Sequence, residues 1–255
     1  MKLSLILMSV IMMGLSVGCS KDADETNSSI SVGITDAPID LDSLILRVTE
    51  ISVRSDSGSF KIIYSGSQSF NLLDFRNGSV KIFGNGDLEG SQVTEVRLKV
   101  DKAYAVKGAN KINITVPSGA SSGLKLKVKN GAIEPGIGYT VVIDFDANRS
   151  LVKKGKFISS GFNLKPVVRA FMKSTTGNIS GTLSGWSNAP IVYAISGTDT
   201  MATALPDNSG NFTVHFLDAG NYSLSVADTL GGSKNYAGPY SVTTGNTTAA
   251  GSLVK

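Results

Sequence analysis

The sequence has one cysteine, one histidine and one tryptophan among 255 residues, and only 17% of its residues are charged. One cysteine cannot form an intramolecular disulfide, and one cysteine with one histidine cannot complete a His/Cys zinc site. A single histidine restricts acid–base catalysis, although carboxylates remain able to perform it. The net charge of +4 is too small to indicate a nucleic-acid-binding protein, so we expect no nucleic-acid partner.

The first segment of the chain has the proportions of a secretion signal. The apolar run Leu3–Val17 is shorter than the roughly 20 residues of a transmembrane helix, and a polar sequence follows it. Its end, Leu15–Cys19, resembles a bacterial lipobox, although Ser16 stands where that family usually has leucine. The resemblance implies that residues 1–18 are a signal peptide and that Cys19 is lipidated after cleavage. The alternative is an ordinary secretory signal with an incidental cysteine.

Residues 19–29 are polar and lack periodicity, which indicates a lipidated, flexible tether. Lys21 followed by acidic residues resembles the short signal that exports some lipoproteins to the outer face of the outer membrane, although a solvated linker also explains it. Several acyl chains would hold the protein firmly at a membrane. We therefore expect a surface-exposed protein of the cell envelope, lipid-anchored to the outer membrane.

From Ile30 onward, apolar and polar residues alternate and no long helical periodicity occurs, which predicts short β-strands. The segment Leu44–Arg54 alternates in two registers, and the change between Val48 and Ile51 predicts a β-bulge. Strands divided by Gly, Asn and Ser at short intervals are typical of antiparallel sandwiches. The predicted fold class is all-β, with two antiparallel β-sandwich domains after the signal peptide and tether.

One pair of strands carries a hairpin signal. The segment Leu124–Lys129 alternates perfectly and is followed by Asn130 and Gly131. This dipeptide is favoured in two-residue hairpin turns because both residues tolerate a positive φ. The segment Tyr139–Ala147 is therefore predicted to return beside Leu124–Lys129.

Composition changes near residue 174. Residues 31–173 hold 20 Lys and Arg against 13 Asp and Glu, a balance of +7, whereas residues 174–255 hold two lysines against four aspartates, a balance of −2. We place a domain boundary at this change, in the linker-like segment Ser174–Gly177. The predicted domains are residues 30–173 and residues 174–255, and the second is long enough for a small sandwich.

Seven short phrases follow one another along the first domain. They are Gly33–Pro38, Phe70–Asp74, Val96–Leu98, Val116–Gly119, Ser122–Leu126, Ile143–Ala147 and Leu164–Arg169. On these phrases, residues 30–171 resemble domain-of-unknown-function family 4382. The resemblance implies a β-rich lipoprotein of the cell envelope and brings no established activity.

The second domain carries four further phrases, which are Ile179–Leu183, Ala189–Ala194, Asp207–Phe212 and Leu217–Leu224. On these phrases, residues 177–255 resemble the carboxypeptidase-regulatory-like, transthyretin-like sandwiches. The resemblance implies a module of carbohydrate-binding-like fold that serves as a sugar-binding face or as a spacer. It says little about a ligand.

Three aspartates form a candidate site in the first domain. Asp144 and Asp146 share one face of a predicted strand, about 7 Å apart, and the turn carrying Asp36 could approach them. Such carboxylates suit Ca²⁺, the only cofactor that we consider, or could flank a glycosidic bond as an inverting pair. The alternative is structural: the strand carboxylates pair with lysines of a neighbouring strand or with Arg149, and Asp36 caps its own turn.

A stripe of lysines is the main basic feature. Lys125, Lys127 and Lys129 lie on one face of a predicted strand, and a second basic group occupies the turn at 153–156. These lysines could meet an anionic polysaccharide, lipid headgroups or nucleic acid. The alternative is a solvated strand face, or a set of charges that protects a sheet edge from pairing.

The single tryptophan and the single histidine both belong to the second predicted domain. Trp186 lies in a predicted loop, where an exposed indole could stack on a sugar or the side chain could instead cap the core. Tyr236 and Tyr240 are the other candidates for an aromatic ligand-binding platform. His215 alternates with apolar neighbours and is expected to face solvent, with no nucleophile signature around it.

These observations favour a non-enzymatic lipoprotein of the cell envelope that acts in binding, adhesion or surface assembly, with a glycan or an envelope protein as partner. The main alternative is a carbohydrate-binding accessory lipoprotein of a glycan-uptake system. A distant third is a hydrolase that uses Asp144 and Asp146. No catalytic residue is assigned on the leading interpretation.

Overall fold

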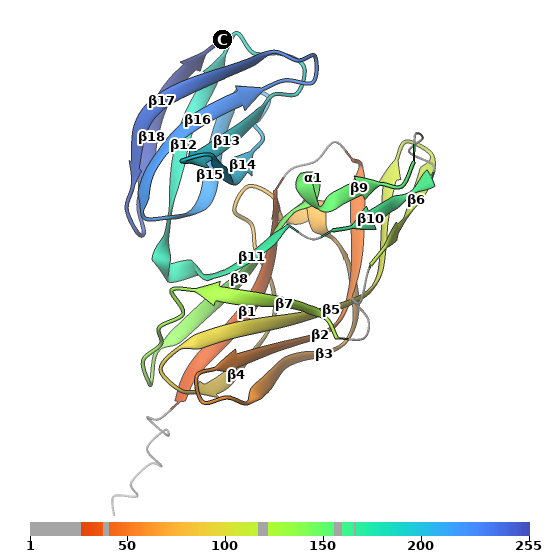
Figure 1. The fold of residues 1–255 in the computed structure, drawn as a ribbon, viewed down its shortest axis with the longest axis vertical. Coiled ribbons are helices and arrows are strands. Elements are labelled where there is room, and N and C mark those ends of the chain that lie inside the picture. Colours follow the sequence, from red (N-terminus) through yellow and green to blue (C-terminus); the bar gives the residue numbers. More distant parts are fainter. Residues whose placement is uncertain (1–26, 38–40, 117–121, 156–159, 166) are drawn as a thin grey trace, which may run out of the picture.

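A computed structural model describes residues 27–37, 41–116, 122–155, 160–165 and 167–255. The described chain is almost entirely β-strand, which confirms the predicted all-β fold class (Figure 1). The exceptions are three short turns of helix, η1 (Leu72–Phe75), α1 (Ala147–Ser150) and η3 (Lys173–Thr175). None of the described helices is long and apolar enough to cross a membrane.

Eleven described strands form the first unit. They are β1 (Asn27–Ala37), β2 (Ser43–Ser55), β3 (Phe60–Asn71), β4 (Lys81–Glu89), β5 (Val93–Lys107), β6 (Asn110–Thr115), β7 (Leu124–Lys129), β8 (Gly138–Asp146), β9 (Leu151–Lys153), β10 (Phe162–Leu164) and β11 (Val168–Met172). Hydrogen bonds link them in the order β4-β1-β8-β11-β7-β5, after which one branch continues to β2 and β3 and another to β6, β10 and β9. The sheet curls until β3 and β4 lie against each other, with the ring of Phe83 on β4 against Tyr64 and Phe70 on β3.

Parallel pairs occur among the antiparallel ones. β1 pairs in parallel with β8, β7 with β11, and β6 with β10. The core lies inside the curl, where Ile30, Leu46, Leu98 and Phe145 are at most 1% exposed. Burial of these large apolar side chains is the main force that stabilises the unit.

The predicted bulge is present. The register of β2 shifts against both β3 and β5 between Val48 and Glu50. Leu44, Leu46 and Val48 are buried before the shift, and Ile51 and Val53 are buried after it. One extra residue therefore returns both halves of the strand to the core face.

The predicted hairpin is wrong. Asn130 does adopt the positive φ that the turn signal indicates, at 50°. However, β11 lies between β7 and β8, so the two predicted partners are not neighbours. The Gly131 carbonyl accepts a hydrogen bond from Val93 N at 2.7 Å, which keeps the chain beside β5 before it crosses to β8. Because β8 is buried almost continuously from Val141 to Phe145, it takes a central place with β1 and β11 as partners.

Seven described strands form the second unit. They are β12 (Thr176–Ser184), β13 (Ile191–Ser196), β14 (Asp199–Ala204), β15 (Asn211–Asp218), β16 (Gly220–Ala227), β17 (Ser233–Val242) and β18 (Thr247–Val254). One sheet has the order β15-β12-β18 and the other β14-β13-β16-β17. Their inner faces enclose a core that includes Ile179, Val192, Val214 and Leu224, each fully buried.

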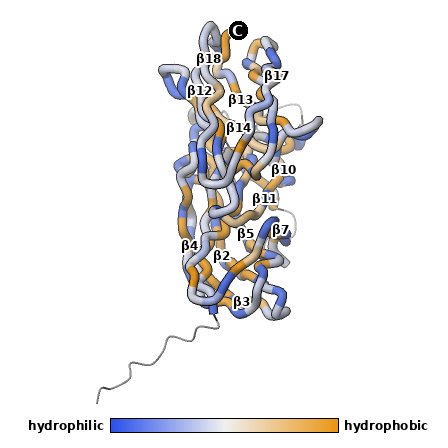
Figure 2. The backbone as a smooth tube through the Cα atoms, turned by 90° about the vertical axis from the view of Figure 1, so that its left-hand side faces the viewer, coloured by the Kyte–Doolittle hydropathy of each residue, from blue (hydrophilic) through white to orange (hydrophobic). Residues whose placement is uncertain are grey.

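The two units follow one another along the longest axis of the molecule (Figures 1 and 2). The first strand begins at Asn27, so the last three residues of the expected tether belong to β1. Ser28 is 1% exposed there, and its hydroxyl donates to the Glu134 carbonyl at 2.7 Å. The predicted lipidation site, Cys19, lies outside the described residues.

Candidate functional site

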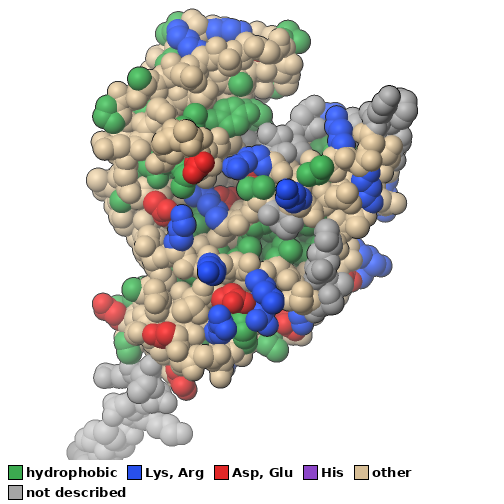
Figure 3. Space-filling model, viewed as in Figure 1, with side chains coloured by type: hydrophobic (Ala, Val, Ile, Leu, Met, Phe, Trp, Pro, Cys, Tyr) green, Lys and Arg blue, Asp and Glu red, His purple; other side chains and the backbone are tan. Residues whose placement is uncertain are grey.

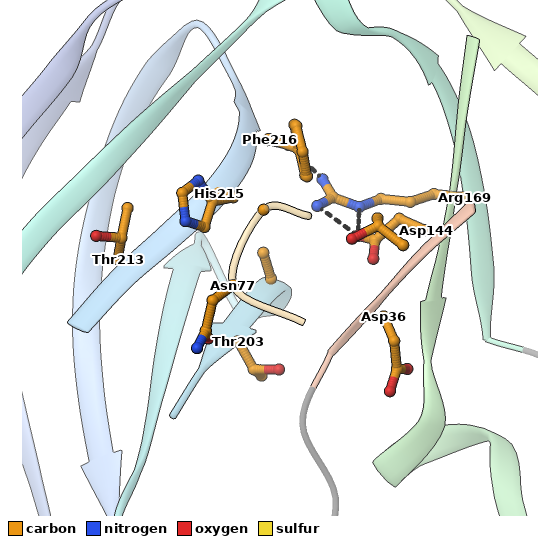
Figure 4. Close-up of a pocket in the computed structure, with 11 residues that line it drawn as sticks. Asp36, Asn77, Asp144, Arg169, Thr203, Thr213, His215 and Phe216 are labelled. Carbon is orange, nitrogen blue, oxygen red and sulfur yellow. Dashed lines mark hydrogen bonds and ion pairs between the residues drawn. The ribbon is translucent and has the colours of Figure 1, made fainter. Parts of the chain in front are cut away.

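One guanidinium joins the two units. Arg169 lies on β11, directly opposite Asp144 on β8. Its Nε and Nη2 atoms each lie 2.7 Å from Asp144 Oδ2. Its Nη1 atom donates to the Phe216 carbonyl oxygen of β15, in the second unit, at 2.8 Å (Figure 4). A single side chain therefore neutralises a carboxylate of one unit and binds the backbone of the other.

Apolar contacts surround this bridge. The rings of Phe171 and Phe216 lie 5.6 Å apart, and Val142 and Val80 pack against them. Nearby, Arg149 Nη1 donates to the Thr200 carbonyl at 3.1 Å. Side chains of both units are therefore packed together at the junction, beyond the covalent connection through η3.

His215 does not face solvent as expected. It packs against the turn that carries Gly78 in the first unit, and its Nδ1 atom lies 3.2 Å from Asn178 Oδ1. Burial lowers the pKa of the imidazole. Gly78 has a φ of +79°, and a Cβ atom there would lie 2.7 Å from the imidazole ring, so only glycine fits. Strand periodicity predicted the face that His215 occupies, but not that another unit covers this face.

Asp36 is the most deeply buried carboxylate of the candidate site, at 5% exposure. Its Oδ1 atom accepts from Ala147 N at 3.2 Å, whereas its Oδ2 atom has no hydrogen-bond partner within the described chain. Burial, and secondarily the charge of Asp144, raises the pKa of Asp36 well above its ordinary value. This contact joins the end of β1 to the start of α1, whereas the turn that Asp36 would cap on the alternative prediction lies outside the described residues.

The three aspartates predicted as a calcium site have separate structural partners. Asp144 pairs with Arg169, a partner that the sequence did not suggest. Asp146 caps α1 by accepting from Arg149 N at 3.0 Å, and its Oδ2 atom lies 3.7 Å from Arg149 Nη1, which was the alternative prediction. Among the described residues, no group of three His, Cys, Asp or Glu side chains is arranged to hold a metal ion. The contacts of Asp144 with Arg169 and of Asp146 with α1 and Arg149 are of the kind that the structural alternative predicts.

The same pairing bears on the distant hydrolase hypothesis. A catalytic carboxylate pair needs one member with a raised pKa and one ionised member. Burial raises the pKa of Asp146, but its Oδ1 atom is occupied by the cap of α1. The bidentate contact with Arg169 fixes Asp144 in an ion pair. Both carboxylates therefore have clear roles in holding the fold.

A groove runs along the junction of the units. It consists of two adjoining hollows of about 300 and 310 Å³, which share Lys129, Val168, Arg169 and Met201 in their walls. The first hollow lies over β7 and β11, and the second extends toward Arg149. Lys and Arg side chains gather around this junction and over the first unit below it (Figure 3). Its size is within the range of pockets that hold small ligands or one segment of a polymer.

The aromatic candidates lie elsewhere in the second unit. Trp186 is half-buried and packs against the second core, which agrees with the capping alternative. Its Nε1 atom donates to the Tyr236 hydroxyl at 3.2 Å, and Lys255 Nζ lies 4.9 Å from the centre of the indole. Tyr240 is also half-buried against the same core. The structure thus brings Trp186 and Tyr236 into contact on the second unit.

Comparison with known families assigns the first unit to a family. A family model described as "Domain of unknown function (DUF4382)" matches residues 27–166, more than half of the chain. The chain belongs to the DUF4382 family. No curated protein matches the sequence. The DUF4382 match includes Asp36, Asp144 and the lysines of β7 but ends before Arg169, so the bridging arginine and the second unit lie beyond it.

Several solved structures show distant similarity. The Bacillus anthracis TIE protein is 10% identical with a TM-score of 0.23, over 90% of this chain and 33% of that one, so this chain spans about a third of its length. BcpA, the major pilin subunit of Bacillus cereus, is 11% identical with a TM-score of 0.20, over 89% and 99% of the two chains. A candidate cell adhesion protein from Bacteroides fragilis is 10% identical with a TM-score of 0.21, over 89% and 93%. At these scores the similarities support no functional argument.

Proposed function

We propose that this DUF4382 protein is a non-enzymatic lipoprotein of the cell envelope that displays two joined β-sandwich units for binding, adhesion or surface assembly. The observation that carries the proposal is the junction. Arg169 and the packed rings of Phe171 and Phe216 hold the units against each other, beside a groove walled by both. A fixed relative position of two units is what a shared binding surface needs.

The proposed membrane location rests on the sequence. The apolar run Leu3–Val17, which Cys19 closely follows, supports a lipid anchor at the start of the mature chain, and the tether would place β1 nearest to the membrane. The second unit, by its phrases and its two facing sheets, is proposed to be a carboxypeptidase-regulatory-like module. No part of this proposal requires a metal or an organic cofactor.

The anchor is tested by metabolic labelling of cells with an alkynyl fatty acid. The wild-type chain is expected to incorporate the label and to remain in the membrane fraction, whereas Cys19→Ala is expected to do neither. Protease treatment of intact cells then tests exposure, because a surface-displayed chain is degraded while the cells remain whole. An unlabelled wild-type chain would reject the lipid anchor, and a protected chain would reject surface display.

Binding is tested by comparing cells that carry the wild-type chain with cells that lack it. Surface adhesion, or the partner recovered after crosslinking on intact cells, is expected to depend on the chain. Arg169→Ala is expected to reduce this dependence by loosening the junction, provided that equal amounts reach the surface. Equal adhesion and identical crosslinked partners with and without the chain would overturn the proposed function.

A second candidate function is carbohydrate binding by an accessory lipoprotein of a glycan-uptake system. The contact between Trp186 and Tyr236 favours it, because neighbouring aromatic rings are suited to stack on a sugar. On this hypothesis, Trp186→Ala removes binding to neutral glycans, whereas the exposed Leu230→Ala in the same unit leaves it unchanged. Unaltered glycan binding by Trp186→Ala would exclude this site.

A further inference from the structure

The outer face of the first unit carries two neighbouring sets of charges. On β2 and β5, positive side chains have carboxylate partners: Arg47 pairs with Asp101, Lys99 with Glu50, and both Arg54 and Arg97 with Glu95. Cross-strand pairs of this kind are the usual arrangement of charges on a sheet. Each of these four positive side chains therefore has a carboxylate partner, with Glu95 shared by two arginines, whereas Lys102 of β5 is exposed and has no such partner in the described chain.

The lysines of the adjacent strand differ. Lys125, Lys127 and Lys129 are all exposed on β7, and within the described part of the chain none has an ion pair or hydrogen bond. Glu95 lies opposite Lys127, but its two oxygens already accept from the two arginines. Arg97 lies opposite Lys125, which places like charges beside each other. Like charges in such positions destabilise a sheet slightly, so the stripe does not contribute to the stability of the fold.

Protection of a sheet edge does not explain the whole stripe. Lysines often protect edge strands from pairing with other chains. β7, however, lies between β5 and β11: it pairs with β5 along Leu124–Lys127 and with β11 at Val128 and Lys129, so Lys129 does not lie on an open edge. The remaining structural alternative is that the lysines form an ordinary solvated face. Their position beside the groove tests this alternative.

The stripe forms one wall of the groove. Lys125, Lys127 and Lys129 line the hollow of about 300 Å³ together with Phe171 from β11 and Met201 from β14. Asp218, at the end of β15, is the carboxylate that lines this hollow. Because alternate residues of a strand lie about 7 Å apart, the wall presents three ammonium groups in a row of about 14 Å. This hollow therefore has one strongly positive wall, an apolar floor formed by the half-buried Val168 and Met201, and one carboxylate, whereas the adjoining hollow is lined by Asp144, Asp146 and Asp199.

We propose that this hollow of the groove binds a linear anionic polysaccharide, whose successive carboxylate or sulfate groups pair with Lys125, Lys127 and Lys129. The proposal rests on the binding function proposed above and names the ligand class for the groove. The sugar rings would lie over the apolar floor, and a hydroxyl group would donate to Asp218. A chain that carries both anionic and neutral hydrogen-bonding groups matches the mixed character of the two walls.

Other polyanions fit less well. Single-stranded nucleic acid needs exposed aromatic side chains on which bases stack, but Phe171 is only 3% exposed. A polyphosphate backbone would also place a charge against Asp218. A flat bilayer cannot reach a wall over which a second unit projects. A peptide added as a strand needs an open edge, and β7 and β11 each have two neighbours.

The test is calorimetric titration of the full chain in neutral detergent with octameric oligogalacturonate, a linear polymer of carboxylated sugars. Binding is expected to be tighter at 50 mM than at 300 mM salt, and neutral dextran of the same length is expected not to bind. The triple variant Lys125→Gln, Lys127→Gln, Lys129→Gln is expected to bind about tenfold more weakly or worse, because three charge contacts are lost. Its melting temperature is expected to be unchanged.

The matched control is Lys61→Gln, Lys102→Gln, Lys153→Gln, which removes the same charge from other exposed positions of the first unit. Its affinity is expected to stay within twofold of wild type. Equal affinity of the wild type and the β7 variant, or tighter binding to single-stranded DNA or to phosphatidylglycerol vesicles than to oligogalacturonate, would overturn the inference. If adhesion on cells persists in the β7 variant while oligogalacturonate does not bind the wild type, only the ligand assignment fails and the proposed function stands.

Discussion

Two charged regions on the outer face of one sheet, β2 with β5 and the neighbouring β7, differ in whether their positive side chains have carboxylate partners. Four positive side chains of β2 and β5, which are Arg47, Arg54, Arg97 and Lys99, each meet a carboxylate, whereas the adjacent strand β7 carries three lysines without a partner in the described chain. Both regions are formed by alternating strands, but the outer side chains of β2 and β5 are mostly half-buried, whereas the lysines of β7 are exposed. A second difference lies in which residues of the neighbouring strand stand opposite. Charged side chains that pair across strands stabilise the sheet. Lysines without such a partner, beside a groove, remain available to bind an anionic ligand.

The junction between the units extends this comparison inward. There, Arg169 is 28% and Asp144 14% exposed at the side chain, so their pair is more enclosed than most pairs on the outer face. Removing one partner of an enclosed pair leaves a poorly solvated charge. The same change on the β7 stripe leaves nothing unpaired. The three environments therefore predict a graded series of effects on stability and an inverse series on ligand binding.

The largest effect is expected at the junction. Arg169→Ala leaves Asp144 without its bidentate partner and the Phe216 carbonyl without its donor. The free energy of unfolding is expected to fall by about 2–4 kcal/mol, measured by urea denaturation. Small-angle scattering is expected to show a broader range of distances between the units.

The matched substitution is Lys127→Ala on the stripe, which is expected to change the free energy of unfolding by less than about 0.5 kcal/mol. Similar losses in the two variants would contradict the distinction between charges that hold the fold and charges that are free. A loss in Arg169→Ala without any change in scattering would show that the arginine stabilises the first unit alone.

The next effect concerns Asp36, a carboxylate of the junction whose Oδ2 atom has no partner in the described chain. Its pKa is raised in the folded state, so folding retains a proton that the unfolded chain releases above its ordinary value of 3.8. Stability from this group is therefore lost as pH rises from about that value through the raised pKa. Asp36→Asn is expected to be more stable than wild type at pH 7, and the difference should shrink toward pH 4.

Thermal unfolding at several pH values measures this difference. The exposed Asp87→Asn is the control for the removal of one carboxylate. His215 changes the pH dependence of stability in the opposite direction. Because burial lowers its pKa, stability from this group is lost as pH falls below its ordinary value of 6.5. A wild-type chain that exceeds Asp36→Asn in stability at pH 7 would show that the ionised carboxylate is stabilised by contacts other than those described.

The sequence predicted the strands better than their neighbours. Alternation is a local property, so the bulge between Val48 and Ile51 and the outward face of the β7 lysines could be inferred directly. The position of β11 between β7 and β8 depends on pairing between distant segments, which no local pattern specifies. For the same reason, the sequence suggested Arg149 as a partner for the aspartates but missed Arg169, and it predicted the face of His215 without the turn at Gly78 that covers it.

A smaller effect is expected from Glu95→Gln, which removes the negative charge that Arg54 and Arg97 share. Glu95 is 14% exposed at the side chain and accepts from Arg54 and Arg97 at 3.0 and 2.8 Å. Losing its charge is expected to reduce the free energy of unfolding by about 1–2 kcal/mol. Because Arg97 lies opposite Lys125, the affinity for oligogalacturonate is expected to rise about two- to fivefold. Reduced or unchanged affinity would separate the ligand site from the β7 stripe.

The smallest effect is expected from Arg47→Ala, at the far end of the balanced region. Arg47 pairs with Asp101 through two nitrogens, but both side chains are partly solvated, so the loss in the free energy of unfolding is expected to be smaller than that of Glu95→Gln. The hydrogen bond from Arg47 holds the pKa of Asp101 below its ordinary value. A lowered carboxyl pKa stabilises the fold above about pH 3.8, and this stability is lost as pH falls through the lowered value. The difference between Arg47→Ala and wild type should therefore be present at pH 7 and vanish in acid, while affinity for oligogalacturonate stays within twofold. A large loss of affinity in this variant would mean that the ligand senses the net charge of the whole face, and the contrast between the two regions would then have no bearing on binding.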